Sequence, residues 1–339
     1  MNLNPFSRLW VSGLAAIGFL YAIKVSSWTF FGVVAAVALL HSLVANQTCQ
    51  TSVKNASVFI TGAGSGLGRA LAVEAARRGA RVVHISGRRV APLQETARLV
   101  RAVNADVVVE IYELDVSKPE MVQQVADRVL QSKHGCPDIL VNNAGMGSWW
   151  HVEDTSMAAG LQMTAVPYLG AFYCTRAFIQ AMQKRGTGHI LNLTSTVSIV
   201  PIRSALTYQV ARYAMRGFSL SLAEDLREYP NIGVTLLNSA EVTGTDYFKT
   251  NANAIPWILT LPAVQAMNYD TTTTAKKTWG AVQAGVTEII LAESLWPVVW
   301  MITLLPGFAQ RMMRLGNIGW RAAEKKKAQE AVAGDKKAD

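Results

Sequence analysis

The sequence is poor in cysteine and in charge. Its 339 residues include three cysteines, and only 16% are Asp, Glu, Lys or Arg. Cys49, Cys136 and Cys174 form no CxxC pair, which argues against both a disulfide framework and a bound metal. Soluble domains carry charge on about a quarter of their residues, so this deficit indicates apolar surface that faces something other than water.

The sequence also lacks any block of basic residues interleaved with aromatics, although its formal net charge is +9. Such a block would favour nucleic acid, so we expect no nucleic-acid partner. The basic balance suits anionic lipid or a phosphorylated cofactor, or simply a solvated face. No internal repeat is present, and the length suits one α/β domain of about 250 residues with extra segments.

Charge is almost absent from the first fifty residues. Between Leu9 and Val53 the only formal charge is Lys24, and apolar runs cover residues 9–23 and 28–45. The second run can span a bilayer, whose core requires ~20 helical residues. A cleaved signal peptide is the alternative, but the apolar stretch is too long and its start is not strongly basic. We predict a membrane anchor over residues 1–54, as one transmembrane helix or a helical hairpin, in the endoplasmic reticulum or a mitochondrial membrane.

A second uncharged stretch, residues 295–309, lies near the other end and is broken by Pro297 and Pro306. Basic and aromatic residues follow it, which favours an interfacial element over residues 293–322. A C-terminal helix packed on the domain is the alternative. Residues 323–339 read as a charged tail.

Residues 55–292 alternate strand-like apolar runs with helical patterns. We expect strands over residues 57–61, 81–85, 107–114, 139–142, 189–193, 233–237 and 287–291. This alternation predicts an α/β fold, a Rossmann-like doubly wound parallel sheet.

A glycine-rich segment, Thr61-Gly62-Ala63-Gly64-Ser65-Gly66-Leu67-Gly68, lies between the first strand and a helix. Such a turn lets the backbone approach a pyrophosphate, and the helix N-terminus supplies N–H donors. The second strand ends in Ser86-Gly87-Arg88-Arg89, without the carboxylate that would hold NAD ribose hydroxyls. Arginine suits a 2′-phosphate, so we predict NADP(H) rather than NAD(H). The alternative is that these arginines merely begin a solvated helix.

Four motifs in order resemble the short-chain dehydrogenase/reductase family. The glycine-rich segment matches TGxxxGxG, Leu114-Asp115-Val116 is similar to the family's adenine-contacting segment, and Asn142-Asn143-Ala144-Gly145 matches NNAG. Ser195 precedes Tyr208 by thirteen residues, the family's spacing for its catalytic Ser and Tyr. With the arginines above, the predicted cofactor residues are Thr61, Gly62, Ser65, Gly66, Leu67, Gly68, Arg88, Arg89, Asp115, Val116, Asn142, Ala144 and Gly145.

The resemblance implies that Tyr208 is the acid/base and that Ser195 orients the substrate, but other family residues are missing. Arg212 stands where YxxxK has Lys, and Pro167 takes the place of the helix Asn. The Pro-Gly pair expected after the sixth strand reads Ala240-Glu241. Arg212 keeps the positive charge that stabilises a tyrosinate, yet it cannot readily relay a proton. Pro167 is expected to keep the helix disrupted because proline removes a backbone hydrogen bond.

Two hypotheses follow. In the first, the protein is an enzyme that transfers hydride with a degenerate catalytic tetrad, in which Ser195 and Tyr208 are kept, Arg212 replaces Lys and the Asn is missing. In the second, these residues are relics, and the protein is an accessory, nucleotide-binding subunit of a membrane protein complex. The apolar segments 255–259 and 261–264, beside an anchor, favour a lipid-like substrate such as a sterol, fatty acyl chain or long-chain base. Alternatively these residues are core or a surface buried against another protein. Trp149 and Trp150, after the NNAG segment, either line the substrate pocket or simply pack in the core. The expected partners are the bilayer, this substrate, and a membrane complex or a homodimer.

Overall fold

The structure, a computed structural model, describes residues 48–147, 149–245, 247, 262–292, 299, 302, 305–308 and 311. Contacts divide the chain into residues 1–47 and 48–339. The predicted anchor runs, the apolar segment 255–259, and most of residues 293–339 lie outside the described residues. None of the helices in the described part of the chain combines the length and apolar character needed to cross a membrane.

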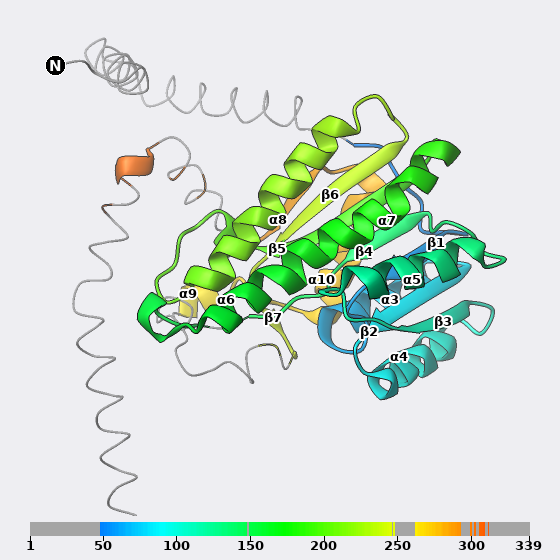
Figure 1. Cartoon of the computed structure of the whole chain (residues 1–339), viewed down its shortest axis with the longest axis horizontal. Helices are drawn as coiled ribbons and strands as arrows, with labels where there is room; N and C mark the ends of the chain where they lie inside the picture. The colour runs from blue at the N-terminus through cyan, green and yellow to red at the C-terminus, as the bar shows by residue number, and fades with distance from the viewer. Residues whose placement is uncertain are drawn as a thin grey trace, which may run out of the picture. The chain divides into compact units, whose positions relative to one another are not determined.

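A seven-stranded sheet in the order β3-β2-β1-β4-β5-β6-β9 forms the centre of the domain (Figure 1). All of its neighbouring strands pair in parallel. The strands are β1 (Ser57–Ile60), β2 (Val82–Gly87), β3 (Val108–Glu113), β4 (Ile139–Asn142), β5 (Gly188–Ser195), β6 (Ile232–Ser239) and β9 (Glu288–Leu291). The predicted strands are confirmed to within two residues at each end. A separate parallel pair joins β7 (Val242–Thr243) to β8 (Tyr269–Asp270).

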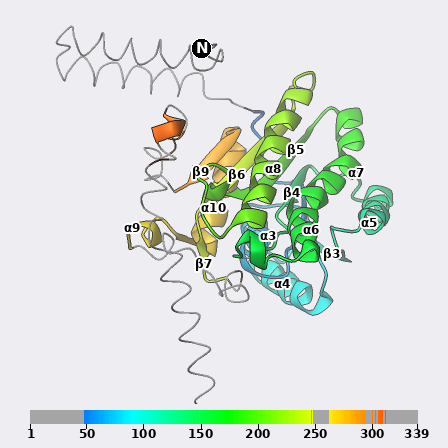
Figure 2. The ribbon, with the colours of Figure 1, turned by 60° about the vertical axis from the view of Figure 1, so that its left-hand side comes forward.

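Helices cover both faces of the sheet, as the turned view in Figure 2 also shows. One layer contains α3 (Gly66–Arg77), α4 (Val90–Val103) and α10 (Thr271–Ala284). The other contains α5 (Pro119–Gln131), α7 (Gly170–Arg185) and α8 (Leu206–Asp225), with α6 (Met157–Thr164) beside α8. A parallel sheet covered on both faces is the predicted doubly wound fold.

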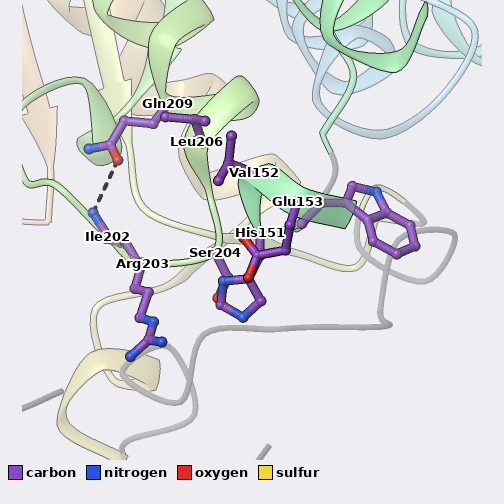
Figure 3. Close-up of a pocket in the computed structure, with 9 residues that line it drawn as sticks. His151, Val152, Glu153, Ile202, Arg203, Ser204, Leu206 and Gln209 are labelled. Atoms are coloured by element: carbon purple, nitrogen blue, oxygen red, sulfur yellow. Dashed lines mark hydrogen bonds between the residues drawn. The ribbon is translucent and has the colours of Figure 1, made fainter. Parts of the chain in front are cut away.

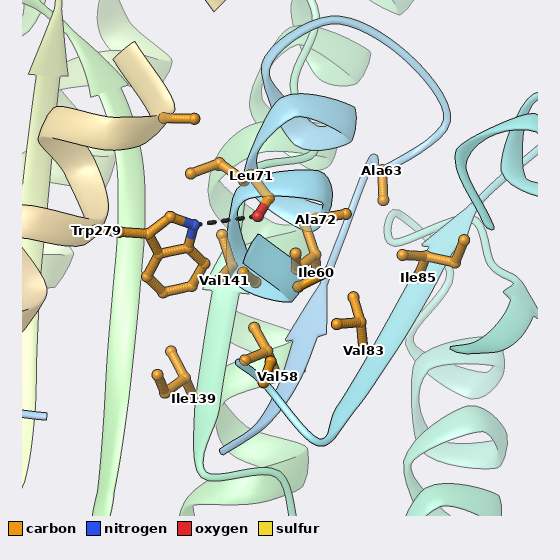
Figure 4. Packing of buried hydrophobic residues seen from close by; sticks show 14 of the residues in the cluster. Val58, Ile60, Ala63, Leu71, Ala72, Val83, Ile85, Ile139, Val141 and Trp279 are labelled. Atoms are coloured by element: carbon orange, nitrogen blue, oxygen red, sulfur yellow. Dashed lines mark hydrogen bonds between the residues drawn. The ribbon is translucent and has the colours of Figure 1, made fainter. Parts of the chain in front are cut away.

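The layers enclose two large apolar clusters, one on each face of the sheet. The four residues of β1 are all buried, which agrees with a central strand that has helices on both sides. In the α3 and α10 layer, the fully buried Trp279 donates its indole N–H to the carbonyl oxygen of Leu71 over 3.1 Å (Figure 4). This bond satisfies the polar atom of a side chain that is otherwise packed among aliphatic residues.

The segment that leads into β1 packs on the domain. The amide of Thr48 donates to the carbonyl of Gly285, and its hydroxyl accepts from the amide of Val234. The hydroxyl of Thr51 lies 2.9 Å from Nδ1 of the buried His189. The compact unit therefore begins after Gln47, seven residues before the predicted boundary at residue 55.

The helix expected to be disrupted at Pro167 is disrupted. Between α6 and α7, residues Ala165–Leu169 form a π-helical turn, and the amide of Gly170 bonds the carbonyl of Ala165, five residues back. Proline has no amide hydrogen to continue the regular pattern, and wide turns of this kind often occur at functional sites. Pro167 itself is buried.

Candidate functional site

Two of the predicted motifs meet at the carboxyl ends of β1 and β4. The hydroxyl of Thr61 accepts hydrogen bonds from the amides of Asn143 and Ala144, both over 3.0 Å. Gly62 has φ +66°, and a Cβ on it would lie 2.9 Å from Cα of Ala144. Only glycine fits so close to this backbone at a positive φ. Gly62 therefore lets the glycine-rich turn pack directly against the NNAG segment.

The glycine-rich turn leaves the start of α3 accessible. Ser65 is the N-cap residue but makes no side-chain capping bond, so it does not satisfy the first amides of the helix. Gly66 has φ +54°, and a Cβ there would approach only Thr245, at 3.4 Å or more. A turn of this shape at a helix N-terminus fits a pyrophosphate.

The end of β2 presents positive charge. Arg88 and Arg89 are exposed, and neither makes a hydrogen bond or ion pair with any residue that the structure describes. Asp115 follows β3 and accepts from the amide and hydroxyl of Ser117. Burial acts to raise the pKa of Asp115, but these bonds, Arg88 and Lys118 outweigh it and lower the pKa. The donors at this end suit a phosphate group.

The side chain of Asn142 makes its hydrogen bonds inside the domain. Its amide nitrogen donates to the hydroxyl of Thr175 on α7 over 3.1 Å and to the side-chain oxygen of Asn192 on β5 over 2.8 Å. Asn192 in turn donates to Ser219 on α8 over 2.9 Å. This buried chain of polar groups ties α7, β4, β5 and α8 together, so the side-chain nitrogen of Asn142 is committed to protein partners.

The three predicted catalytic residues come from two neighbouring elements. Ser195 is the last residue of β5, and Tyr208 and Arg212 lie one turn apart on α8. Residues four apart share one face of a helix, so the phenol and the guanidinium are neighbours. Tyr208 is only 4% exposed. Beside it, Trp149 is buried and packs edge-on to the phenol ring at 5.1 Å between centroids.

Arg212 carries a buried positive charge. Its guanidinium carbon lies 4.8 Å from the centre of the Tyr208 ring, and Nη2 donates to Tyr247 over 2.7 Å and to the Met146 carbonyl over 3.4 Å. A Cβ on Gly145 would lie 3.1 Å from Nη2, so the group also touches the NNAG segment. Burial acts to lower the pKa of Arg212, but Tyr247 and Tyr208 outweigh it, and the pKa lies above its ordinary value.

The sequence did not single out Tyr247 or Thr245 as site residues. Both follow β7 in an irregular segment with no periodic pattern. Glu241, which belongs to the pair that replaces the family's Pro-Gly, follows β6 and accepts from Asn268 over 3.3 Å. A hollow of about 340 Å³ lies at the start of α8, between residues 150–153 and 202–209 (Figure 3). Its lining comes from two segments and includes Trp150, His151, Glu153, Arg203, Ser204 and Gln209.

The family model described as "short chain dehydrogenase" matches residues 56–255. Human short-chain dehydrogenase/reductase 3 is 30% identical over 250 residues, which cover 74% of this chain and 79% of that protein. This chain therefore belongs to the short-chain dehydrogenase/reductase family, as the motifs predicted.

Other relatives match over shorter lengths. The probable oxidoreductase EphD of Mycobacterium tuberculosis is 38% identical over 181 residues, which are 53% of this chain and only 30% of that protein. The 3-ketodihydrosphingosine reductase of Bos taurus is 27% identical and covers 58% of this chain and 59% of the relative.

Solved structures confirm the fold. A metagenomic short-chain oxidoreductase in complex with NADP is 25% identical, with a TM-score of 0.58, covering 71% of this chain and 97% of that one. A Burkholderia phymatum short-chain dehydrogenase/reductase in complex with NAD is 24% identical, with a TM-score of 0.64, covering 74% and 94%.

Proposed function

We propose that the protein is an NADP(H)-dependent oxidoreductase that interconverts a carbonyl and an alcohol on a lipid-like substrate at a membrane. The observation that carries the proposal is the joining of the glycine-rich turn, the NNAG segment and the Tyr208–Arg212 pair at one edge of the sheet. Gly62 against Ala144 and Arg212 against Gly145 make these motifs one continuous surface.

The cofactor would lie along this surface. The turn from Thr61 to Gly68 and the start of α3 would hold the pyrophosphate, and Asp115 and Val116 would face the adenine end. Arg88, which is exposed at the end of β2, would hold the 2′-phosphate bidentately. The bound nicotinamide dinucleotide supplies or accepts the hydride.

The chain's own residues would handle the proton. In reduction, the Tyr208 hydroxyl donates its proton to the substrate oxygen, which Ser195 orients from the end of β5. A tyrosinate forms, and the guanidinium of Arg212 stabilises its charge because the opposite charges lie close together with little water between them. Removing the Tyr208 hydroxyl should therefore slow turnover by ~100-fold or more.

The proposal of a lipid-like substrate and a membrane location is supported by the sequence and by similarity to a relative. The first fifty residues, which are almost free of charge, and the apolar segments 255–259 and 261–264 favour a substrate that partitions into lipid. A relative named 3-ketodihydrosphingosine reductase supports a long-chain carbonyl.

Hydride transfer by the detergent-purified full chain tests the proposal. NADPH oxidation is followed over a panel of long-chain aldehydes, sterol ketones and long-chain 3-keto bases, with Tyr208→Phe as the inactive control. We expect activity that Tyr208→Phe abolishes. NADPH binding without any turnover across the panel would instead support the accessory-subunit hypothesis, which native sizing of the gently extracted complex then tests.

A further inference from the structure

Arg212 lies between two phenols. Its guanidinium stacks over the ring of Tyr208 at 4.8 Å, and Nη2 donates to the hydroxyl oxygen of Tyr247 over 2.7 Å. The Arg212 residue is 6% exposed, its Nε has no hydrogen-bond partner, and no Asp or Glu in the described part of the chain pairs with it. The oxygen that this buried cation contacts most closely therefore belongs to Tyr247.

The position of Tyr247 depends on a glycine. A Cβ on Gly147 would lie 2.7 Å from Cε1 of the Tyr247 ring, so the ring rests directly on the backbone that follows the NNAG segment. The ring centroids of Tyr247 and Tyr208 are 6.5 Å apart. Tyr247 thus lies near Tyr208 although it belongs to the segment after β7.

The chemistry of the three groups is complementary. Arginine only donates hydrogen bonds, so the Tyr247 oxygen accepts from it, and the hydroxyl of Tyr247 can act as a donor at the same time. Burial raises the pKa of Tyr247, Arg212 opposes this rise, and Tyr208 adds to it through charge and a hydrogen bond. Tyr247 therefore keeps its proton near neutral pH, and its ring lies 6.5 Å from that of Tyr208 with Arg212 in contact with both.

We infer that Tyr247 is a proton-relay residue for Tyr208. The inference rests on the proposed function and assigns a role that Arg212 cannot perform, because a guanidinium does not readily give up a proton. As a carbonyl receives its hydride, the O–H bond of Tyr208 breaks and an O–H bond forms on the substrate oxygen. The O–H bond of Tyr247 then breaks, its proton restores Tyr208, and a proton from water restores Tyr247.

Tyr247→Phe tests this relay because it removes one oxygen and keeps the ring on Gly147. We expect kcat to fall about 10- to 100-fold, the lower part of the range for general acid–base groups, with KM and the NADPH dissociation constant unchanged within about twofold. Gly147→Ala should reproduce the loss, because the added methyl displaces the Tyr247 ring while leaving its hydroxyl present. Tyr112→Phe is the matched control, since Arg128 stacks over Tyr112 at 5.3 Å on the distant β3.

A second readout does not need turnover. In protein labelled with ¹³C at tyrosine Cζ, Tyr247→Phe should shift the Tyr208 resonance at a fixed pH, whereas Tyr112→Phe should not. An active wild type whose Tyr247→Phe variant keeps kcat within twofold overturns the relay and leaves the proposed function standing. An inactive wild type whose Tyr208 resonance still responds supports the coupled tyrosines and removes the oxidoreductase. A Tyr208 resonance that does not respond overturns the relay in either case.

Discussion

The guanidinium of Arg212 sits over the ring of Tyr208, 4.8 Å from its centre. Arg212→Lys replaces the planar group by a compact ammonium on a shorter stem. We expect turnover to be kept or raised, because an ammonium restores the group that the family places here and can act as a point charge. Steady-state turnover on a substrate found by the panel measures the effect, and a loss of tenfold or more would show that this site requires the guanidinium itself.

The exposed arginine after β2 should set the choice of cofactor. Arg88→Ala removes charge-assisted hydrogen bonds worth ~1.5–3 kcal/mol, so the dissociation constant for NADPH should rise about tenfold or more while that for NADH is unchanged. Fluorescence titration measures both. Arg98→Ala is the matched control, because Arg98 is an exposed arginine on α4 that pairs with Glu95. Equal effects of Arg88→Ala on both cofactors would contradict a 2′-phosphate contact.

The buried indole between α3 and α10 should be a large contributor to stability. Trp279→Ala leaves a cavity and removes the indole hydrogen bond to the Leu71 carbonyl, so we expect the free energy of unfolding to fall by ~3–5 kcal/mol. Urea unfolding followed by circular dichroism measures the change. Trp150→Ala, at a side chain that is 36% exposed, should cost ~0.5 kcal/mol or less. Similar costs for the two variants would be inconsistent with this packing.

Buried histidine should make the fold sensitive to acid. Burial lowers the pKa of His189 to about 3, whereas an unfolded histidine titrates near ~6.5. Between these values the unfolded chain binds a proton that the folded chain does not, so the free energy of unfolding falls as pH drops from ~6.5 towards 3 and is fully kept above ~6.5. His84, whose pKa burial lowers to about 4, acts in the same direction.

His189→Gln isolates this contribution. Urea unfolding at pH 6 and pH 4 should give a shallower pH dependence than in the wild type, by up to ~1.4 kcal/mol per pH unit. The carboxylates are common to both proteins, so their contribution cancels in the comparison. Parallel pH profiles would show that His189 does not titrate differently in the two states.

Patterns of local sequence predicted most of the fold, because parallel strands buried on both faces are short apolar runs between helical periods. The strand-turn-helix at Thr61–Gly68 and the disruption at Pro167 were also predictable, since each depends on the backbone chemistry of glycine or proline. Residues 48–54 were assigned to the anchor because an almost uncharged segment looks the same whether it packs on a sheet or enters a bilayer. The structure instead pairs Thr48 with Gly285 and Thr51 with His189.

The contacts around Arg212 could not be predicted in the same way. Tyr247 lies 35 residues further along the chain, in an irregular segment where no period indicates which way a side chain points. The sequence drew attention to Trp149 but did not predict its edge-on contact with Tyr208, because that contact depends on the path of the loop after β4. The polar chain from Thr175 to Ser219 likewise joins four elements, and pairings of this kind are set by tertiary structure alone.

The π-helical turn at Ala165–Leu169 determines how α6 is rotated about the helix axis relative to α7. A wide turn holds one more residue than a regular helix would, and one residue corresponds to a rotation of about 100° around the axis. Met163, just before the turn, packs into the cluster that contains Trp149 and Tyr208. If the turn became regular with all of its residues kept, α6 would therefore rotate relative to α7 and Met163 would move away from Tyr208, without a change in any residue that touches the site; deleting one residue as well would restore the phase.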